Sequence, residues 1–225
     1  MGTLFIIATP IGNLEDVTFR AIETLKSLDL LFCEDTRVTV RLLERYGLHV
    51  PMDSYREDAH RVKLDRVLAA LREGKRVGLV SDAGTPAISD PGFRLVRDVL
   101  AAEPETTVIP IPGPSAVAAA LSVSGLPSDE FLFLGFPPHK KGRTAAFKEA
   151  LGQPRTVVLY ESTHRIEKAL AAIAELAPDR GLVVGREITK MHETFYRGTA
   201  SEIMEQLAKT SSRGEFVIVI APSGA

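Results

Sequence analysis

The sequence predicts an α/β protein with two domains, in which the N-terminal sheet is mostly parallel and the C-terminal sheet is mixed. In the first half, short apolar runs alternate with segments of helical spacing, which is typical of parallel strands joined by crossover helices. The second half starts in the same way but ends in closely spaced strand candidates, which indicates a mixed sheet. Pro112-Gly113-Pro114-Ser115 interrupts the chain between these halves. We therefore expect an N-terminal domain at residues 1–112 and a C-terminal domain at residues 113–225.

The elements of the first half are predicted from apolar spacing and from the Gly, Pro and helix-capping residues between them. Asp16 and Thr18 are both good N-caps, so a helix is expected from one of them to about Leu28. Its apolar face is expected to carry Phe19, Ile22, Leu25 and Leu28. The other segments, in order, are a strand at 3–8, a strand at 30–33, a helix at 40–46 that ends at Gly47, a weak strand at 51–55, an amphipathic helix at 60–72, a strand at 76–80, a helix at 93–100 and a strand at 107–111.

The second half is predicted on the same grounds, with a basic loop at residues 137–143 between its first strand and the following helix. The expected segments are a small-residue helix at 116–123, a strand at 131–136, a helix at 144–151, a strand at 156–160, a helix at 166–176, strands at 182–185 and 194–198, a helix around 203–207 and a final strand at 215–221.

Composition limits the classes of protein to which the chain can belong. It has 225 residues, of which 45% are hydrophobic and 25% charged, as is ordinary for a soluble globular protein. The net charge of −2 excludes a protein coated in positive charge, but a local basic patch is compatible with it. Cys33 is the single cysteine, which excludes an internal disulfide and favours the cytoplasm. We expect no signal peptide and no membrane span, because no apolar run is long enough.

The loop at residues 81–92 is the segment around which the N-terminal domain is organised. It follows the apolar strand at 76–80 and places the carboxylate of Asp82 just beyond that strand. In open α/β sheets, ligands bind at the carboxyl ends of the strands, and long loops there tend to be functional. The alternative is a turn-rich connector in which Ser89 or Asp90 caps the next helix.

Polar clusters follow five of the expected strands. Since the carboxyl ends of parallel strands lie at one edge of a sheet, we expect these clusters to converge on one cleft. They are residues 9–13, 34–37, 82–85, 112–115 and 161–165.

Several kinds of site are excluded or disfavoured by the motifs that are absent. The chain has no GxGxxG dinucleotide motif, no Walker A lysine, no HExxH and no GxSxG elbow. Its five histidines are scattered, so we expect no metal site. His192 and Glu193 beside Lys190 form a charged cluster that suits either a solvated face or a functional site.

Six motifs occur in the order of one family. They are Thr9-Pro10-Ile11-Gly12-Asn13-Leu14, Cys33-Glu34-Asp35-Thr36-Arg37, residues 81–92, Pro112-Gly113-Pro114-Ser115-Ala116, Glu161-Ser162-Thr163-His164-Arg165 and Arg186-Glu187-Ile188-Thr189-Lys190. In these motifs the chain resembles the 16S ribosomal RNA (cytidine-2′-O)-methyltransferases of the tetrapyrrole methylase superfamily. Thr163 departs from the pattern, because members commonly have proline there, and many members carry a further C-terminal segment.

The resemblance implies a homodimer of tetrapyrrole methylase-like subunits, each with S-adenosylmethionine in a cleft between its two α/β domains. Carried over by motif, the residues expected to bind the cofactor are Pro10, Ile11, Gly12, Asp82, Thr85, Ser115, Ala116, Tyr160, Arg186 and Glu215. A carboxylate such as Asp82 suits the ribose hydroxyls and the ammonium of this cofactor. The expected reaction is methylation of a cytidine 2′-oxygen in small-subunit ribosomal RNA, helped by a base or a cation. The candidates for that role are Lys190, Glu193, Asp35 and Arg37.

The RNA substrate implied by the resemblance requires positive side chains that contact phosphate. The candidates are Lys140, Lys141 and Arg143 in the basic loop, together with His164 and Arg165. Two alternatives are a methylase of small tetrapyrroles such as precorrins and a nucleotide- or phosphate-binding module without chemistry, whose Gly/Pro loops would bind anions.

Overall fold

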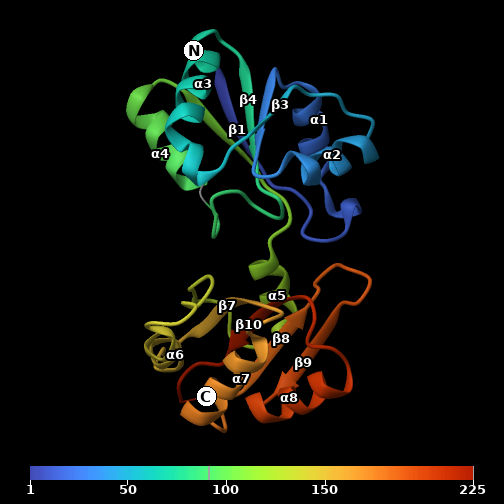
Figure 1. Cartoon of the computed structure of the whole chain (residues 1–225), viewed down its shortest axis with the longest axis vertical. Coiled ribbons are helices and arrows are strands. Elements are labelled where there is room, and N and C mark those ends of the chain that lie inside the picture. The colour runs from blue at the N-terminus through green and yellow to red at the C-terminus, as the bar shows by residue number, and fades with distance from the viewer. Residues whose placement is uncertain (91, 225) are drawn as a thin grey trace. The chain divides into compact units, whose positions relative to one another are not determined.

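A computed structural model describes residues 1–90 and 92–224 of the chain (Figure 1). The chain divides into two units, Met1–Ser115 and Ala116–Ala225. Each unit has its own sheet and its own buried apolar clusters. The division falls at the end of Pro112-Gly113-Pro114-Ser115, the segment in which we predict the domain boundary.

The sheet of the first unit is parallel throughout, as predicted from the alternation of strands and helices. It contains β1 (Thr3–Ile7), β2 (Leu30–Cys33), β3 (Met52–Ser54), β4 (Arg76–Val80) and β5 (Thr107–Ile111). The strand order is β3-β2-β4-β1-β5, and every neighbouring pair is parallel. The carboxyl ends of all five strands therefore lie at one edge of this sheet.

Helices cover both faces of this sheet, because its strands are apolar on both sides (Figure 1). Phe5 and Ile7 pack in one cluster with α1 (Phe19–Lys26) and α2 (Thr36–Arg45). Leu4 packs in the opposite cluster with α3 (His60–Arg72) and α4 (Gly92–Ala102). Two short 3-10 helices, η1 (Leu14–Asp16) and η2 (Glu57–Ala59), precede α1 and α3.

One prediction about α1 is wrong. Phe19 is 89% exposed, whereas Ala21 and Leu25 are buried. Thr18 is the N-cap and accepts a hydrogen bond from the Ala21 amide at 3.1 Å, so Phe19 is the first residue of the helix. At about 100° per residue, Phe19 lies roughly 160° around the helix from the buried Ala21, and it therefore points away from the sheet.

The sheet of the second unit is mixed, as predicted. It contains β6 (Phe131–Phe133), β7 (Thr156–Ser162), β8 (Leu182–Arg186), β9 (Thr194–Gly198) and β10 (Glu215–Ile220), in the order β6-β7-β10-β8-β9. β6 and β7 are parallel, and the other three neighbouring pairs are antiparallel. β6 is shorter than predicted and is followed by Gly135, whose φ of 64° turns the chain.

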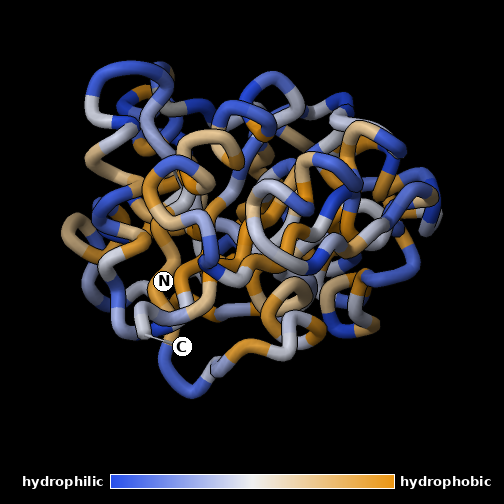
Figure 2. Tube along the Cα trace, turned by 90° about the horizontal axis from the view of Figure 1, so that it is seen from below, coloured by the Kyte–Doolittle hydropathy of each residue, from blue (hydrophilic) through white to orange (hydrophobic). Residues whose placement is uncertain are grey.

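Three helices cover one face of this sheet: α6 (Arg143–Leu151), α7 (Ile166–Leu176) and α8 (Ala200–Lys209). Their side chains meet the alternate residues of β7, β8 and β10 in a single apolar cluster. The intervening residues of β10, which include Val217 and Val219, are also buried, and α5 (Ala116–Ser124) packs against this strand. In Figure 2 the hydrophobic segments run mainly inside the trace and the hydrophilic ones mainly at its outer turns.

None of the helices within residues 1–90 and 92–224 combines the length and the apolar composition that a bilayer crossing requires.

Candidate functional site

Hydrogen bonds join the loops at the carboxyl edge of the first unit's sheet. Thr9, after β1, exchanges two backbone hydrogen bonds with Gly84, after β4, at 2.9 and 3.1 Å. The Thr85 hydroxyl donates to the Pro114 carbonyl, after β5, at 3.1 Å. Three of the predicted polar clusters therefore form one connected edge, built from segments far apart in the sequence.

The cluster after β2 joins the same edge through Asp82. The Asp35 backbone N–H donates to Asp82 Oδ1 at 2.9 Å, across 47 positions of sequence. Burial raises the pKa of the Asp82 carboxyl above its ordinary value, although this hydrogen bond acts in the opposite direction. Asp82 forms no ion pair with any residue that the structure describes. A carboxylate whose pKa is perturbed by burial and by neighbouring charges, here those of Asp35, Arg56 and Arg37, is a candidate for a functional site.

Asp35 and Arg37, two of the candidates for catalysis, form an ion pair with each other. Asp35 caps α2 by accepting from the Arg37 N–H at 2.9 Å, and its carboxylate also binds the Arg37 guanidinium through two nitrogens. These hydrogen bonds with Arg37 hold the pKa of Asp35 well below its usual range. A carboxyl group stabilised in this way is a poor general base.

The loop after β4 is held in a strained conformation. Ala87 and Ser89 have φ values of 72° and 64°, in the left-handed region that residues with a side chain rarely adopt. Both oxygens of Asp90 accept from the Ala87 N–H at 2.8 Å, and Oδ1 also accepts from Gly92 at 2.7 Å. Such strain persists only where the surroundings fix it, and it clusters at functional sites.

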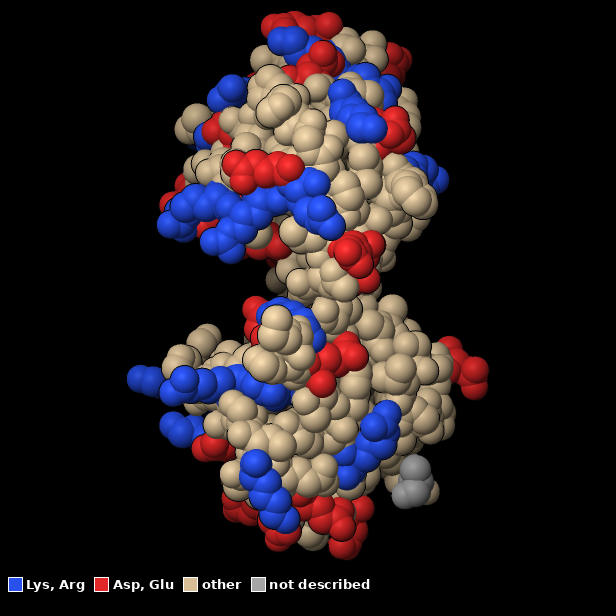
Figure 3. All heavy atoms as spheres, turned by 90° about the vertical axis from the view of Figure 1, so that its right-hand side faces the viewer, with Lys and Arg blue, Asp and Glu red and all other residues tan. Residues whose placement is uncertain are grey.

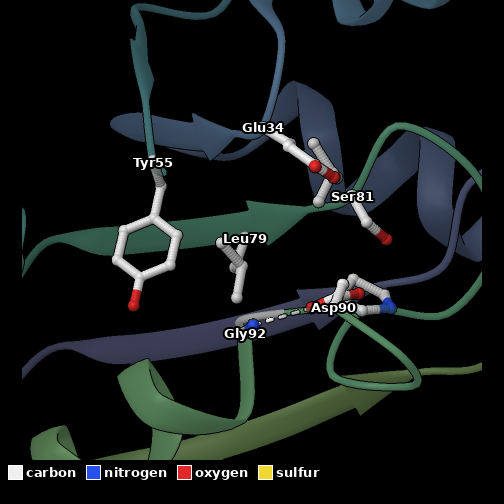
Figure 4. Close-up of a pocket in the computed structure, with 8 residues that line it drawn as sticks. Glu34, Tyr55, Leu79, Ser81, Asp90 and Gly92 are labelled. Atoms are coloured by element: carbon white, nitrogen blue, oxygen red, sulfur yellow. Dashed lines mark hydrogen bonds between the residues drawn. The ribbon is translucent and has the colours of Figure 1, made fainter. Parts of the chain in front are cut away.

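A cavity of about 10 Å³, roughly enough for one water molecule, lies behind this loop (Figure 4). The buried Ser81 Oγ has no hydrogen-bond partner among residues 1–90 and 92–224. Burial, followed by the nearby carboxylates of Asp82 and Asp90, raises the pKa of Glu34. The cavity is lined by Glu34, Tyr55, Leu79, Val80, Ser81, Pro86, Asp90 and Gly92.

The predicted cofactor residues of the first unit lie on the connected edge. Asp82 and Thr85 contribute to its hydrogen bonds, and Ile11 faces Gly84 closely, since a Cβ built on Gly84 would lie 3.2 Å from Ile11 Cγ2. Gly84 has a φ of 82°, so the turn itself also requires glycine. The other predicted residues on these loops are Pro10, Gly12 and Ser115.

In the second unit, Lys190 lies in the β8–β9 connection and contacts two carboxylates. Its Nζ is 3.0 Å from Glu187 Oε1 and 2.8 Å from Glu215 Oε2. Burial lowers the pKa of Lys190, but the hydrogen bonds to Glu215 and Glu187 outweigh it and raise the pKa above its ordinary value. Lys190 is therefore held as an ammonium ion. This arrangement favours a role as a cation over a role as a general base.

Glu193 and Arg186 both form hydrogen bonds with the backbone in or beside this connection. Glu193 is exposed, and its Oε2 accepts from the Thr189 N–H at 2.6 Å. Arg186 is buried and donates to the carbonyls of Arg213 at 2.6 Å and His192 at 3.3 Å. Thr189 has a φ of 67°, so this connection is strained like the loop after β4. Arg186 thus helps to hold the connection together.

Tyr160 lies in an aromatic group near the end of β7. Its ring centroid is 4.9 Å from that of Phe133 and 5.4 Å from that of Phe136. Burial raises the pKa of its phenol, opposed by a hydrogen bond with the backbone of Val117. Ala116, the neighbour of Val117, is the first residue of α5.

The candidate RNA contacts fall into two groups. The guanidinium groups of Arg143 and Arg165 bind the buried carboxylate of Glu161 at 2.7 and 2.6 Å. They already have an intramolecular partner, and a phosphate contact by either stays a prediction. The other candidates are exposed: His164, Lys140 and Lys141. Figure 3 shows that Lys and Arg form local groups among acidic and uncharged residues on the face in view.

Thr163 has a structural explanation. Its hydroxyl donates to the Gly214 carbonyl and accepts from the Gly214 N–H, both at 2.7 Å. Gly214 directly precedes β10, so this pair fixes the turn after β7 to the neighbouring strand. A proline at this position would have no hydroxyl for these bonds.

Ser81, Glu187 and Glu161 are not among the site residues predicted from the sequence. All three lie within the six motifs, but the contacts of Glu187 with Glu215 and of Glu161 with Arg143 join segments that only the fold brings close. The described residues contain no group of three or more His, Cys, Asp and Glu side chains arranged to hold a metal ion.

Known proteins resemble the chain over nearly its whole length. A Thermotoga maritima protein named "Ribosomal RNA small subunit methyltransferase I" is 42% identical over 221 residues, which cover 98% of this chain and 99% of that protein. A Neisseria meningitidis serogroup A protein of the same name is 47% identical over 225 residues, covering 99% of this chain and 77% of its own length. An Escherichia coli O157:H7 protein of that name is 44% identical over 223 residues, covering 97% of this chain and 77% of that protein.

Solved structures share the fold. A uroporphyrin-III-C-methyltransferase from Thermus thermophilus superposes with a TM-score of 0.68 at 18% identity, covering 98% of this chain and 94% of that one. The methyltransferase CobJ superposes with a TM-score of 0.71 at 19% identity, covering 99% of this chain and 95% of that one. The sequence model of the "Tetrapyrrole (Corrin/Porphyrin) Methylases" matches residues 3–204. These matches confirm the resemblance seen in the motifs, and the chain belongs to the tetrapyrrole methylase family.

Proposed function

We propose that this chain uses S-adenosylmethionine to methylate small-subunit ribosomal RNA, at the 2′-oxygen of a cytidine. The observation that carries the proposal is the set of relatives named ribosomal RNA small subunit methyltransferase I, at 42–47% identity along nearly the whole chain. The choice of the 2′-oxygen of a cytidine rests on the motif resemblance. Two strained loops support the proposal. The loop after β4 carries Asp82, which suits cofactor binding, and the β8–β9 connection carries Lys190, which suits methyl transfer.

The first unit's loops fit the cofactor chemically. Asp82 offers a carboxylate without an ion-pair partner in the described chain. Ribose hydroxyls and an ammonium group would satisfy it through charge-assisted hydrogen bonds. The glycines of these loops permit close approach to backbone groups. When bound, S-adenosylmethionine supplies an electrophilic methyl group.

The chain's contribution to the chemistry is positioning and charge stabilisation. Holding the 2′-oxygen in line with the methyl group can supply much of the rate enhancement. We assign Lys190 to stabilise negative charge that develops on that oxygen, because its carboxylate partners keep it protonated. Of the other candidates, Asp35 forms an ion pair with Arg37, which lowers its basicity. We therefore assign Glu193, whose carboxylate is exposed, as the candidate base.

RNA binding is assigned to local positive charge, because the net charge of −2 provides no general attraction to phosphate. Lys140 and Lys141 are adjacent in sequence, and the side chains of both are exposed to solvent. They lie in the basic loop, just before α6. The proposal further includes a homodimer in the cytoplasm that acts on ribosomal RNA within the small subunit.

The double substitution Lys140→Glu with Lys141→Glu is expected to weaken binding of small ribosomal subunits. For each phosphate contact that the substitutions remove, the slope of log affinity against log salt should become shallower by about one. Affinity for S-adenosylmethionine should be unchanged, because the substitutions lie outside its binding residues. The measurement is methylation of ribosomal particles across a salt series. Wild-type efficiency at every salt concentration would show that the loop does not contact RNA.

Transfer of labelled methyl from S-adenosylmethionine tests the proposed function. We expect label in small ribosomal subunits and none in precorrin. Label in precorrin alone would identify a small-molecule methylase, and label in neither would favour a binding module. Subunits purified from cells that lack this activity are the proper substrate, because their target nucleotide is unmodified.

A further inference from the structure

A buried charged cluster at the end of β7 links the basic loop to the sheet. Glu161 has no exposed side-chain surface, and both of its oxygens are bound. Oε1 accepts from Arg165 Nε at 2.6 Å and from the Ser162 N–H at 2.9 Å, while Oε2 accepts from Arg143 Nη2 at 2.7 Å. The two arginine side chains are only 15% and 12% exposed. One carboxylate therefore holds two largely buried guanidinium groups in place.

Both guanidinium groups also bind the backbone at the start of the basic loop. Arg165 Nη1 donates to the Pro137 carbonyl at 3.1 Å, and Arg143 Nη1 donates to the Pro138 carbonyl at 3.3 Å. Arg143 is at the same time the first residue of α6, where the loop ends. The cluster therefore fixes the loop at both ends. Between these two ends lie the exposed side chains of Lys140 and Lys141.

Stability alone is a weak explanation for this cluster. Taking charges out of water is costly, and packed apolar residues of similar size often stabilise a protein as well as a buried ion pair does. What apolar residues cannot do is donate several hydrogen bonds in fixed directions to loop carbonyls, as planar guanidinium groups can. The arrangement therefore fixes the position of the loop backbone. It does so through two arginine side chains, both of which are held by the Glu161 carboxylate.

We propose that Glu161 is a positioning residue that holds the basic loop in the conformation in which Lys140 and Lys141 reach RNA phosphate. This inference rests on the proposed function. In this proposal Arg143 and Arg165 hold the loop backbone, and Lys140 and Lys141 contact the phosphate. Glu161 acts on the substrate only through the loop.

The test is Glu161→Gln, which keeps the size of the side chain but removes its charge and one acceptor. We expect the KM for small ribosomal subunits to rise about tenfold and the salt dependence of binding to flatten, as it does when phosphate contacts are removed. The kcat and the affinity for S-adenosylmethionine should stay the same. Limited trypsin digestion should cut faster after Lys140 and Lys141. Glu167→Gln, which removes the same charge from an exposed position of α7, is the matched control and should change none of these.

Combining Glu161→Gln with the lysine double variant separates the positioning role of Glu161 from the RNA contact by Lys140 and Lys141. If Glu161 acts through the loop, Glu161→Gln should add no further loss to Lys140→Glu with Lys141→Glu. If the lysine variant weakens binding but folded Glu161→Gln does not, the positioning role is overturned and the RNA contact stands. If the lysine variant binds as the wild type does, the loop does not contact RNA and both assignments are overturned.

A second variant keeps the proposal falsifiable if Glu161→Gln does not fold. Arg143→Lys retains the charge and a partner for Glu161, but one ammonium cannot reproduce the guanidinium's directed bonds to Glu161 and to the Pro138 carbonyl. It should raise the KM for subunits and the rate of tryptic cleavage in the loop, at unchanged kcat. A folded Arg143→Lys protein with wild-type KM and cleavage would overturn the proposal.

Discussion

Asp82→Ala is expected to weaken S-adenosylmethionine binding by about 10- to 150-fold while the chain stays folded. This range corresponds to the roughly 1.5–3 kcal/mol that a hydrogen bond to a charged group contributes. The side chain is partly buried just beyond the end of β4, and its carboxylate forms no direct ion pair in the described chain, although the charges of Arg56 and Arg37 act on it. The cofactor's ammonium and hydroxyl groups would provide donors for this carboxylate. Calorimetric titration of the folded variant measures the effect.

Asp82→Asn is the control, because an amide oxygen can still accept from the Asp35 N–H as Asp82 Oδ1 does at 2.9 Å. It removes the charge but preserves the link between the loops after β2 and β4. We therefore expect an intermediate loss of affinity for Asn and a larger one for Ala. Equal affinities for the wild type and folded Asp82→Ala would rule out a cofactor contact by this residue.

Lys190→Met is expected to lower kcat by about 100- to 1,000-fold, the usual effect of removing one group that stabilises charge in a transition state. Lys190 interacts with Glu187 and Glu215, and Glu187 keeps its other hydrogen bond, from the Glu215 N–H at 2.9 Å, when the ammonium is removed. The fold should therefore persist. Cofactor affinity should change little, so single-turnover kinetics with bound S-adenosylmethionine isolate the effect on methyl transfer.

The pH dependence distinguishes a cationic role of Lys190 from a basic one. Its carboxylate partners raise its pKa, so the ammonium form predominates at neutral pH and is lost only at high pH. A cation that stabilises charge should then give a rate that falls as pH rises through this raised pKa. A general base would give a rate that rises there. Lys190→Arg should retain more activity than Lys190→Met, and equal loss in both would contradict the cationic role.

The sheets were predictable from sequence because they follow from local patterns. Alternating apolar runs and helical segments indicated parallel strands, and the carboxyl ends of such strands meet at one edge whatever their order. The error at Phe19 arose because apolar residues spaced at i and i+3 drift around a helix by about 60° at each step, so that Phe19 lies about 120° from the buried Leu25.

The contacts within the candidate site were not predictable in the same way. Asp82 meets the Asp35 N–H across 47 positions, and Arg143 meets Glu161 across 18, so neither pairing leaves a local pattern in the sequence. The basic loop and the motif at residues 161–165 made Arg143 and Arg165 candidates for phosphate contact, whereas the fold gives both a buried carboxylate partner. The left-handed conformations of Ala87 and Ser89 also run against residue preference, since strain is maintained by surrounding structure.

The nucleosides released from methylated 16S ribosomal RNA test the proposed reaction most directly. Small subunits that lack the modification would be incubated with the protein and labelled S-adenosylmethionine, and their RNA digested and separated by chromatography with mass spectrometry. We expect the label in 2′-O-methylcytidine, at a single position, and its loss with Lys190→Met. Label on a base, on another nucleoside or on no RNA at all would contradict the proposed reaction.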